Sequence, residues 1–155
     1  MMDMGPAPAS EARRQVISFM IEPELMGFSL EHVEKVIEAP EFNFVPRSPE
    51  FLKGAINHHG KVIAVVDMRE FLGMGSSEVT LDSRVLILAS QVYYLGFLVD
   101  RVERIESVPV QGRLVQDPDP GESNPYIHKM VNLGGRILNL VDLEKLLSEI
   151  ENYFD

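Results

Sequence analysis

Two adjacent histidines, His58 and His59, are the residues of this chain best suited to chemistry. Imidazole can bind a metal ion, or it can act as a catalytic base near neutral pH. Adjacent side chains in a strand point to opposite faces, so a shared zinc ion would need two further protein ligands. The other histidines of the chain, His32 and His128, are the candidates for this role. A metal site, a solvated hairpin tip and a protein-contact surface all stay open at this point.

Carboxylates offer two further kinds of site. Asp67 and Asp142 could form a paired-acid centre, but each also stands where a helix begins, and an N-cap role explains it. The loop with Asp117, Asp119 and Glu122 has the composition of a calcium loop, yet its prolines break the ligand spacing. The sequence has no cysteine, phosphate-binding glycine loop, G-x-S-x-G motif or HExxH motif. We therefore predict a binding or scaffolding protein rather than an enzyme, with no catalytic residue, metal site or cofactor.

The composition restricts the fold and its partners. A chain of 155 residues that is 45% hydrophobic can form the core of an ordinary domain. Its formal net charge of −10 repels phosphate backbones, so we expect no nucleic-acid partner. Its continuous apolar runs reach only about five residues, against roughly 20 for a membrane-spanning helix, so we expect no direct membrane insertion. Residues 1–13 are polar and proline-bearing, and we expect a disordered N-terminal lead there.

The sequence elements around the histidines and aspartates occur twice. Residues 60–72 align with residues 135–147, and Asn57 aligns with Asn132, at an offset of 75. Upstream, residues 27–36 align with residues 96–105 at an offset of 69. A longer loop in the second copy, the stretch QDPDPGESNP, explains the difference between the two offsets. The repeated order predicts two related subdomains.

Each copy has the pattern of β-structure. Residues 62–66 and 85–89 are short, apolar and rich in β-branched side chains, which predicts buried strands. Polar residues and glycine at 57–60 and 132–135 predict hairpin turns between an incoming and an outgoing strand. The adjacent histidines therefore lie at the tip of a turn.

A short helix is expected after the outgoing strand of each copy. Asp67 and Glu70 have the spacing of a capping box, and Gly73 is placed to end the first helix. Asp142 begins a longer C-terminal helix, in which apolar residues recur at helical spacing along 143–150. Several short strands with brief helices predict a mainly β architecture.

Motifs along the whole chain resemble those of the CheW family of bacterial chemotaxis adaptors. They are FSLEHV at 28–33, GAIN at 54–57, GKVIAVVDMR at 60–69, GFLVDRV at 96–102 and ILNLVD at 137–142. The resemblance covers residues 14–150 and implies a single CheW-like domain, followed by a tail at 151–155. The implied fold is mainly β: two intertwined SH3-like five-stranded β-barrel subdomains with short helices and a C-terminal helix.

The resemblance also implies a function. It predicts a non-catalytic signalling adaptor in bacterial chemotaxis or a chemosensory-like pathway. Its partners would be the cytoplasmic hairpin tips of chemoreceptors and the regulatory domain of a CheA-type histidine kinase. The protein would then be cytoplasmic and associated with membrane receptor arrays. The alternative is a metal-dependent enzyme that uses the His58 and His59 hairpin.

The candidate receptor-contact residues follow from the resemblance and depart from it in part. The family commonly has leucine and arginine at the positions of His58 and His59, and glutamate at that of Lys35. If Lys35 and His59 are neighbours, the lysine disfavours the protonated histidine, and the usual attraction is lost. We therefore expect a divergent receptor or pathway. The receptor-contact candidates are Lys35, Val36, Ile37, Gly54, Asn57, His58 and His59.

Overall fold

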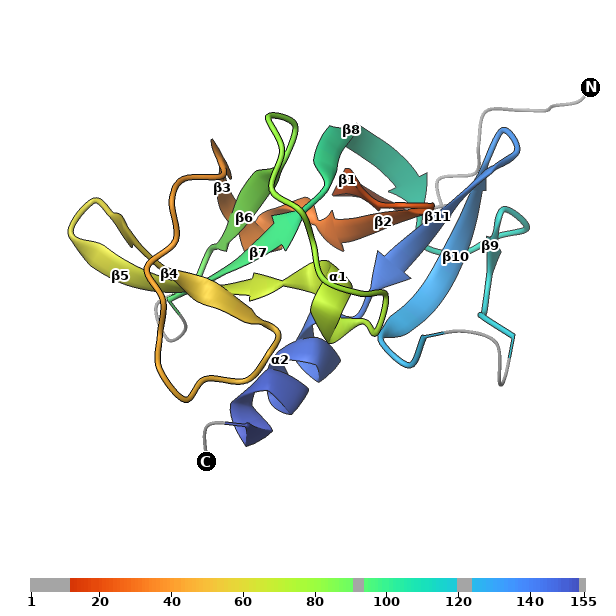
Figure 1. The fold of residues 1–155 in the computed structure, drawn as a ribbon. Helices are drawn as coiled ribbons and strands as arrows, with labels where there is room; N and C mark the ends of the chain where they lie inside the picture. The colour runs from red at the N-terminus through yellow and green to blue at the C-terminus, as the bar shows by residue number, and fades with distance from the viewer. Residues whose placement is uncertain (1–11, 91–93, 120–123, 154–155) are drawn as a thin grey trace, which may run out of the picture.

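The computed structural model describes residues 12–90, 94–119 and 124–153, which form two β-sheets and short helices (Figure 1). The first sheet contains, in spatial order, β8 (Arg101–Pro109), β1 (Arg13–Ile21), β2 (Glu24–Ser29), β11 (Arg136–Val141), β10 (Ile127–Leu133) and β9 (Val115–Gln116). The second contains β3 (Val33–Glu38), β6 (Arg84–Leu88), β7 (Leu95–Val99), β5 (Lys61–Asp67) and β4 (Leu52–His58). The helices are the 3-10 helix η1 (Leu30–His32), α1 (Met68–Phe71) and α2 (Leu143–Asn152).

The strand orders confirm the internal duplication. Reading β8-β1-β2-β11-β10 against β3-β6-β7-β5-β4 puts each strand opposite its sequence counterpart, with the two-residue strand β9 added to the first sheet. Both sheets contain one parallel pair, β2 with β11 and β7 with β5. Gly27 pairs with Leu140 in the first, and Gly96 pairs with Val65 in the second. The mainly β, two-subdomain fold is therefore as predicted.

The two subdomains are intertwined because the chain crosses between the sheets twice. Strands β1 and β2 join the sheet formed by the C-terminal half, while β3 to β7 build the other sheet between them in sequence (Figure 1). Each sheet has its own apolar cluster, and a third cluster joins the two. Phe28 and Phe97, equivalent in the duplication, are fully buried in this joint cluster, with ring centroids 5.4 Å apart. The joint core makes the two copies depend on each other for burial.

The predicted helix caps are present. Asp67 accepts hydrogen bonds from the backbone N–H groups of Arg69 and Glu70, and Asp142 accepts one from Lys145. The expected capping box of α1 is only half formed, because the Glu70 carboxylate accepts a hydrogen bond from Ser76 instead of returning to the cap. The backbone N–H of Asp67 donates to the Phe51 carbonyl at 2.7 Å, which explains why the second half is not made.

The ordered elements at the two ends of the chain extend slightly beyond the predicted bounds. Strand β1 begins at Arg13, the last residue of the expected lead, and α2 continues to Asn152, inside the expected tail. Residues 1–11, residues 154–155 and Glu122 of the acidic loop lie outside the described residues. Among the residues that the structure describes, no helix has the length and apolar character needed to span a membrane.

Candidate functional site

The histidine pair lies at the tip of the β4–β5 hairpin. His58 pairs with Lys61, so His59 and Gly60 form a two-residue loop. Both loop residues have positive φ, 52° at His59 and 81° at Gly60, as a type I′ turn requires. The Asn57 side-chain oxygen accepts a hydrogen bond from the Gly60 N–H at 3.1 Å and fixes this turn. The prediction of a turn tip is confirmed.

The second copy has the same turn with different chemistry. Asn132 accepts a hydrogen bond from the Gly135 N–H at 2.9 Å, and Gly134 has a φ of 62°. Gly134 stands at the position of His59. A left-handed conformation disfavours a residue with a Cβ by about 1–2 kcal/mol but leaves glycine free of strain. The first hairpin therefore carries an exposed imidazole at a position where the second copy has the unstrained residue.

His58 is half-buried, and its environment disfavours the protonated form. Its ring lies edge-on to that of His59, with centroids 4.1 Å apart, and its Nε2 is shielded without a hydrogen-bond partner in the described part of the chain. Desolvation lowers the pKa of His58, electrostatic interactions with His59 and Lys35 lower it further, and Lys61 adds to this effect. Glu34 acts in the opposite direction. The neutral imidazole is therefore favoured at the hairpin.

Lys35, on an edge strand of the second sheet, lies near His58 at the hairpin tip. Strands β3 and β4 are the two edges of that sheet, yet Lys35 of β3 lies close enough to lower the pKa of His58 at the end of β4. Ile37 of β3 and Ile56 of β4 also share one apolar cluster. Lys35 therefore lies near the hairpin tip, although it belongs to a different strand. A direct effect of Lys35 on His59 stays a prediction.

The remaining candidates divide between surface and core. Asn57 is exposed, whereas Val36 packs against the joint core and Ile37 against the core of the second sheet. Gly54 is buried, and a Cβ placed there would lie 2.7 Å from the backbone oxygen of Asn43. Close packing of two backbone segments therefore explains the glycine. Lys35, Asn57 and His59 are exposed, and Val36, Ile37 and His58 are partly buried.

Sequence reasoning missed apolar side chains beside this tip. Val62 pairs with Asn57 and is 66% exposed. Lys61 places its Nζ 5.3 Å from the centre of the Tyr94 ring, at the distance of a cation–π contact. Val62 belongs to an apolar run, which predicted burial, so local pattern gave no signal of its exposure. We add Lys61, Val62 and Tyr94 to Lys35, Asn57, His58 and His59, and we call this set of residues the hairpin surface.

The histidines do not converge on a metal ion. Among the described residues, no group of three or more histidines, cysteines, aspartates or glutamates could hold one. His32 and His128 line a different cleft of about 300 Å³, together with Arg14 and Glu144. Neither His58 nor His59 lines that cleft. The metal-dependent enzyme is therefore not favoured.

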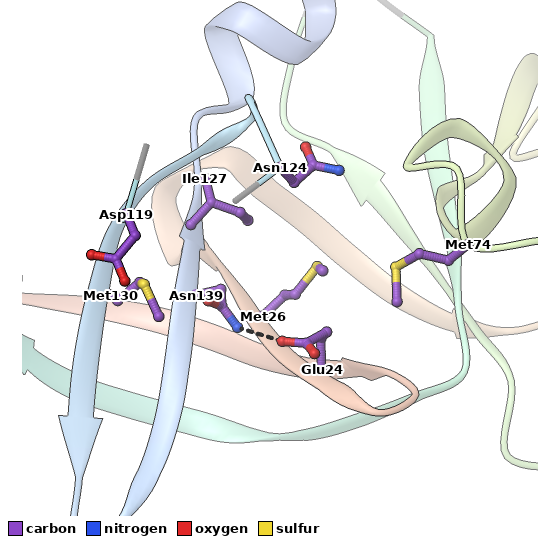
Figure 2. Close-up of a pocket in the computed structure, with 8 residues that line it drawn as sticks. All are labelled: Glu24, Met26, Met74, Asp119, Asn124, Ile127, Met130 and Asn139. Carbon is purple, nitrogen blue, oxygen red and sulfur yellow. Dashed lines mark hydrogen bonds between the residues drawn. The ribbon is translucent and has the colours of Figure 1, made fainter. Parts of the chain in front are cut away.

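A second cleft has a volume of about 530 Å³ (Figure 2). Met26, Met74 and Met130 extend into it and make it largely apolar. Asn139 donates hydrogen bonds to the Leu25 carbonyl at 2.9 Å and to Glu24 at 3.4 Å. The amide thus has a structural role. The described lining residues include the carboxylates of Glu24 and Asp119 but no histidine, serine or lysine.

Comparisons with known proteins identify the family of this chain. The CheW-like domain family model matches residues 15–151. Chemotaxis protein CheW of Thermotoga maritima is 31% identical over 136 residues, which cover 88% of this chain and 89% of that protein. Protein FrzA of Myxococcus xanthus is 26% identical, with 91% of each chain covered.

A solved structure supports the fold. The crystal structure of scaffolding protein TtCheW from Thermoanaerobacter tengcongensis matches with a TM-score of 0.73 and 23% identity, over 84% of this chain and 89% of that chain. At this identity the match concerns the fold. Together with the family model, which spans nearly all of the described residues, it agrees with the two-barrel architecture. The chain therefore belongs to the CheW-like domain family, a family of chemotaxis scaffold proteins that are not enzymes.

Proposed function

We propose that the protein is a signalling adaptor that couples chemoreceptor cytoplasmic tips to the regulatory domain of a CheA-type histidine kinase. The observation that carries the proposal is membership of the CheW-like family over residues 15–151, supported by the matching fold. The pathway is chemotaxis or a related chemosensory system. In this role the protein works in the cytoplasm beside membrane receptor arrays.

We assign the hairpin surface to the receptor. Lys35 and Lys61 bring two positive charges to the tip and Glu34 one negative charge, in a chain whose net charge is −10. The exposed Val62 adds apolar area beside these charges. Complementary charge sets specificity and association rate, and apolar anchors contribute most of the affinity. The surface therefore suits a receptor helix with an acidic and an apolar stripe.

Kinase coupling is tested by calorimetric titration of the full chain with the regulatory domain of the CheA-type kinase from the same organism. Binding in the micromolar range at one-to-one stoichiometry is expected. The control is the same titration with the kinase's phosphotransfer domain, which should give no heat of binding. If the regulatory domain gives no heat while the adaptor is folded, as judged by its unfolding transition, kinase coupling is refuted.

Receptor assignment is tested with the double variant Lys35→Glu and His59→Arg, which restores the residues common in the family. Binding to a receptor hairpin fragment from a standard chemotaxis system should tighten by up to about fivefold, since exposed charge pairs contribute about 0–1 kcal/mol. Binding to the protein's own receptor should weaken. The matched control is Gly134→Arg, which alters the equivalent turn of the second copy. Unchanged or weaker binding to the standard receptor would argue against a divergent pairing.

A further inference from the structure

A third cleft, of about 590 Å³, has aromatic walls and lies between the two subdomains. Phe51 and Phe71 come from one copy, and Tyr126 and Tyr153 from the other. The Phe51 ring meets the rings of Phe71 and Tyr153 edge-on, with centroids 4.9 Å away in each case. The Phe71 and Tyr126 rings are 5.3 Å apart. These four side chains, which we call the aromatic cleft, form one continuous chain of ring contacts.

The backbone holds the aromatic cleft in place through the duplication. Phe51 and Tyr126 occupy equivalent positions, and the carbonyl of each accepts a hydrogen bond of 2.7 Å from a helix-capping aspartate N–H. The donors are Asp67 and Asp142, whose side chains cap α1 and α2. The two strand ends are therefore anchored in the same way. Tyr153, at the end of α2, is 60% exposed and completes the wall from the solvent side.

The charges around the cleft are mainly negative. Glu50 and Glu70 line it, and Arg47 is the one basic residue in its described lining. Burial raises the pKa of Tyr126, and the neighbouring Glu149 and Tyr153 raise it further. Glu149 thus lies close enough to add its negative charge to the electrostatic field of the cleft. Aromatic faces and carboxylates together disfavour an anion and attract a cation.

We propose that the aromatic cleft binds the guanidinium group of an arginine side chain on a partner protein. A guanidinium is planar and stacks on aromatic rings, while its N–H groups donate to carboxylates. The cleft offers both kinds of contact, with an aromatic face at the exposed Tyr153 and carboxylates at Glu50 and Glu70. A quaternary ammonium has no N–H group to donate to the carboxylates, and a neutral apolar side chain gains nothing from their charge. This assignment is independent of the receptor and kinase roles proposed above.

The test is an NMR titration of the full-length protein, which follows the assigned ring resonances of Tyr126 and Tyr153. The probes are acetyl-arginine amide and its neutral isostere acetyl-citrulline amide. Saturable shifts with arginine and none with citrulline are expected, while the Tyr94 ring on the hairpin surface stays unchanged. Equal shifts with both probes would show that charge is not recognised and would overturn the proposal. Tighter binding of tetramethylammonium than of arginine would replace the partner arginine by a small free cation.

Variants separate recognition from folding. Tyr153→Leu should weaken arginine binding about two- to fivefold, as loss of an exposed cation–π contact implies, while Tyr153→Phe should change it less than about twofold. Arg47→Gln should tighten binding because it removes a competing cation. Tyr153 is 60% exposed, so Tyr153→Phe should keep the wild-type unfolding midpoint, and Tyr153→Leu should lower it only by the loss of the edge contact with Phe51. If the leucine and phenylalanine variants lose equal affinity at equal stability, ring stacking plays no part and the proposal fails.

Discussion

Replacing Gly54 by alanine tests whether this residue belongs to the contact surface or to the framework beneath it. Gly54 has a φ of 154°, in the region that favours glycine. A Cβ there would lie 2.7 Å from the Asn43 backbone oxygen and 2.9 Å from the Phe42 Cβ. Asn43 is held by two 2.9 Å hydrogen bonds to Ala55, so it cannot move aside without breaking them. The substitution is therefore expected to destabilise the fold.

The size of the effect follows from two contributions. Backbone strain at a position suited to glycine costs about 1–2 kcal/mol, and forcing an extra methyl group into a packed site costs about 1–3 kcal/mol. Together they lower the free energy of unfolding by about 3 kcal/mol, a large part of the roughly 5–15 kcal/mol of an ordinary domain. For a protein of this size, the melting temperature should fall by roughly 6–12 °C.

The matched control is Gly60→Ala at the hairpin tip. Gly60 has a φ of 81°, but no heavy atom lies within 4 Å of its added Cβ, so only backbone strain should act there. Backbone strain of about 1–2 kcal/mol should lower its melting temperature by roughly 2–8 °C. Both variants are measured by thermal and urea unfolding at equal protein concentration. If Gly54→Ala is as stable as Gly60→Ala, the close approach to Asn43 does not constrain Gly54, and a contact role would regain support.

Three further predictions concern the hairpin and the joint core. His59→Gly should raise the free energy of unfolding by roughly 0.5–1 kcal/mol in urea, since glycine relieves the left-handed strain; a loss of stability would contradict this. Because the pKa of His58 is lowered below its ordinary 6.5, the unfolded chain binds the proton more tightly. Stability should therefore fall as pH drops from about 6.5 through the lowered pKa, and His58→Gln should flatten that slope in pH-dependent urea unfolding. Phe97→Ala should remove about 3–5 kcal/mol in a single transition seen by circular dichroism, against less than about 0.5 kcal/mol for the exposed Phe44→Ala; two separate transitions would contradict a joint core.

Local chemistry explains how much of the fold could be predicted from the sequence. Asn57 and Asn132 fix their turns through contacts three residues away, and Asp67 and Asp142 cap helices that begin at the next residue. Such features depend on nearby residues, so spacing alone reveals them. The half-formed capping box shows the limit, because a distant carbonyl, that of Phe51, takes the N–H that Glu70 was expected to bind.

Features built from distant segments could not be predicted in the same way. No periodicity indicates that β1 and β2 join the sheet of the C-terminal half, because strand partners are chosen by the whole core rather than by local pattern. The exposure of Val62 and the meeting of Phe51 with Tyr153 have the same origin. The family resemblance supplied the architecture. The aromatic cleft is built from segments far apart in the sequence, so no local pattern predicted it.

The duplication gives a way to separate framework from function in this chain. Where the copies agree, as in the turn asparagines and in the contact of Phe28 with Phe97, a shared structural need explains the residue. Where the two copies have different residues at the same backbone conformation, that conformation does not explain which residue is present. His59 and Gly134 share the left-handed conformation, and only the histidine carries strain there. The excess strain at one of two equivalent turns is therefore the strongest structural reason to assign the receptor to the first hairpin rather than the second.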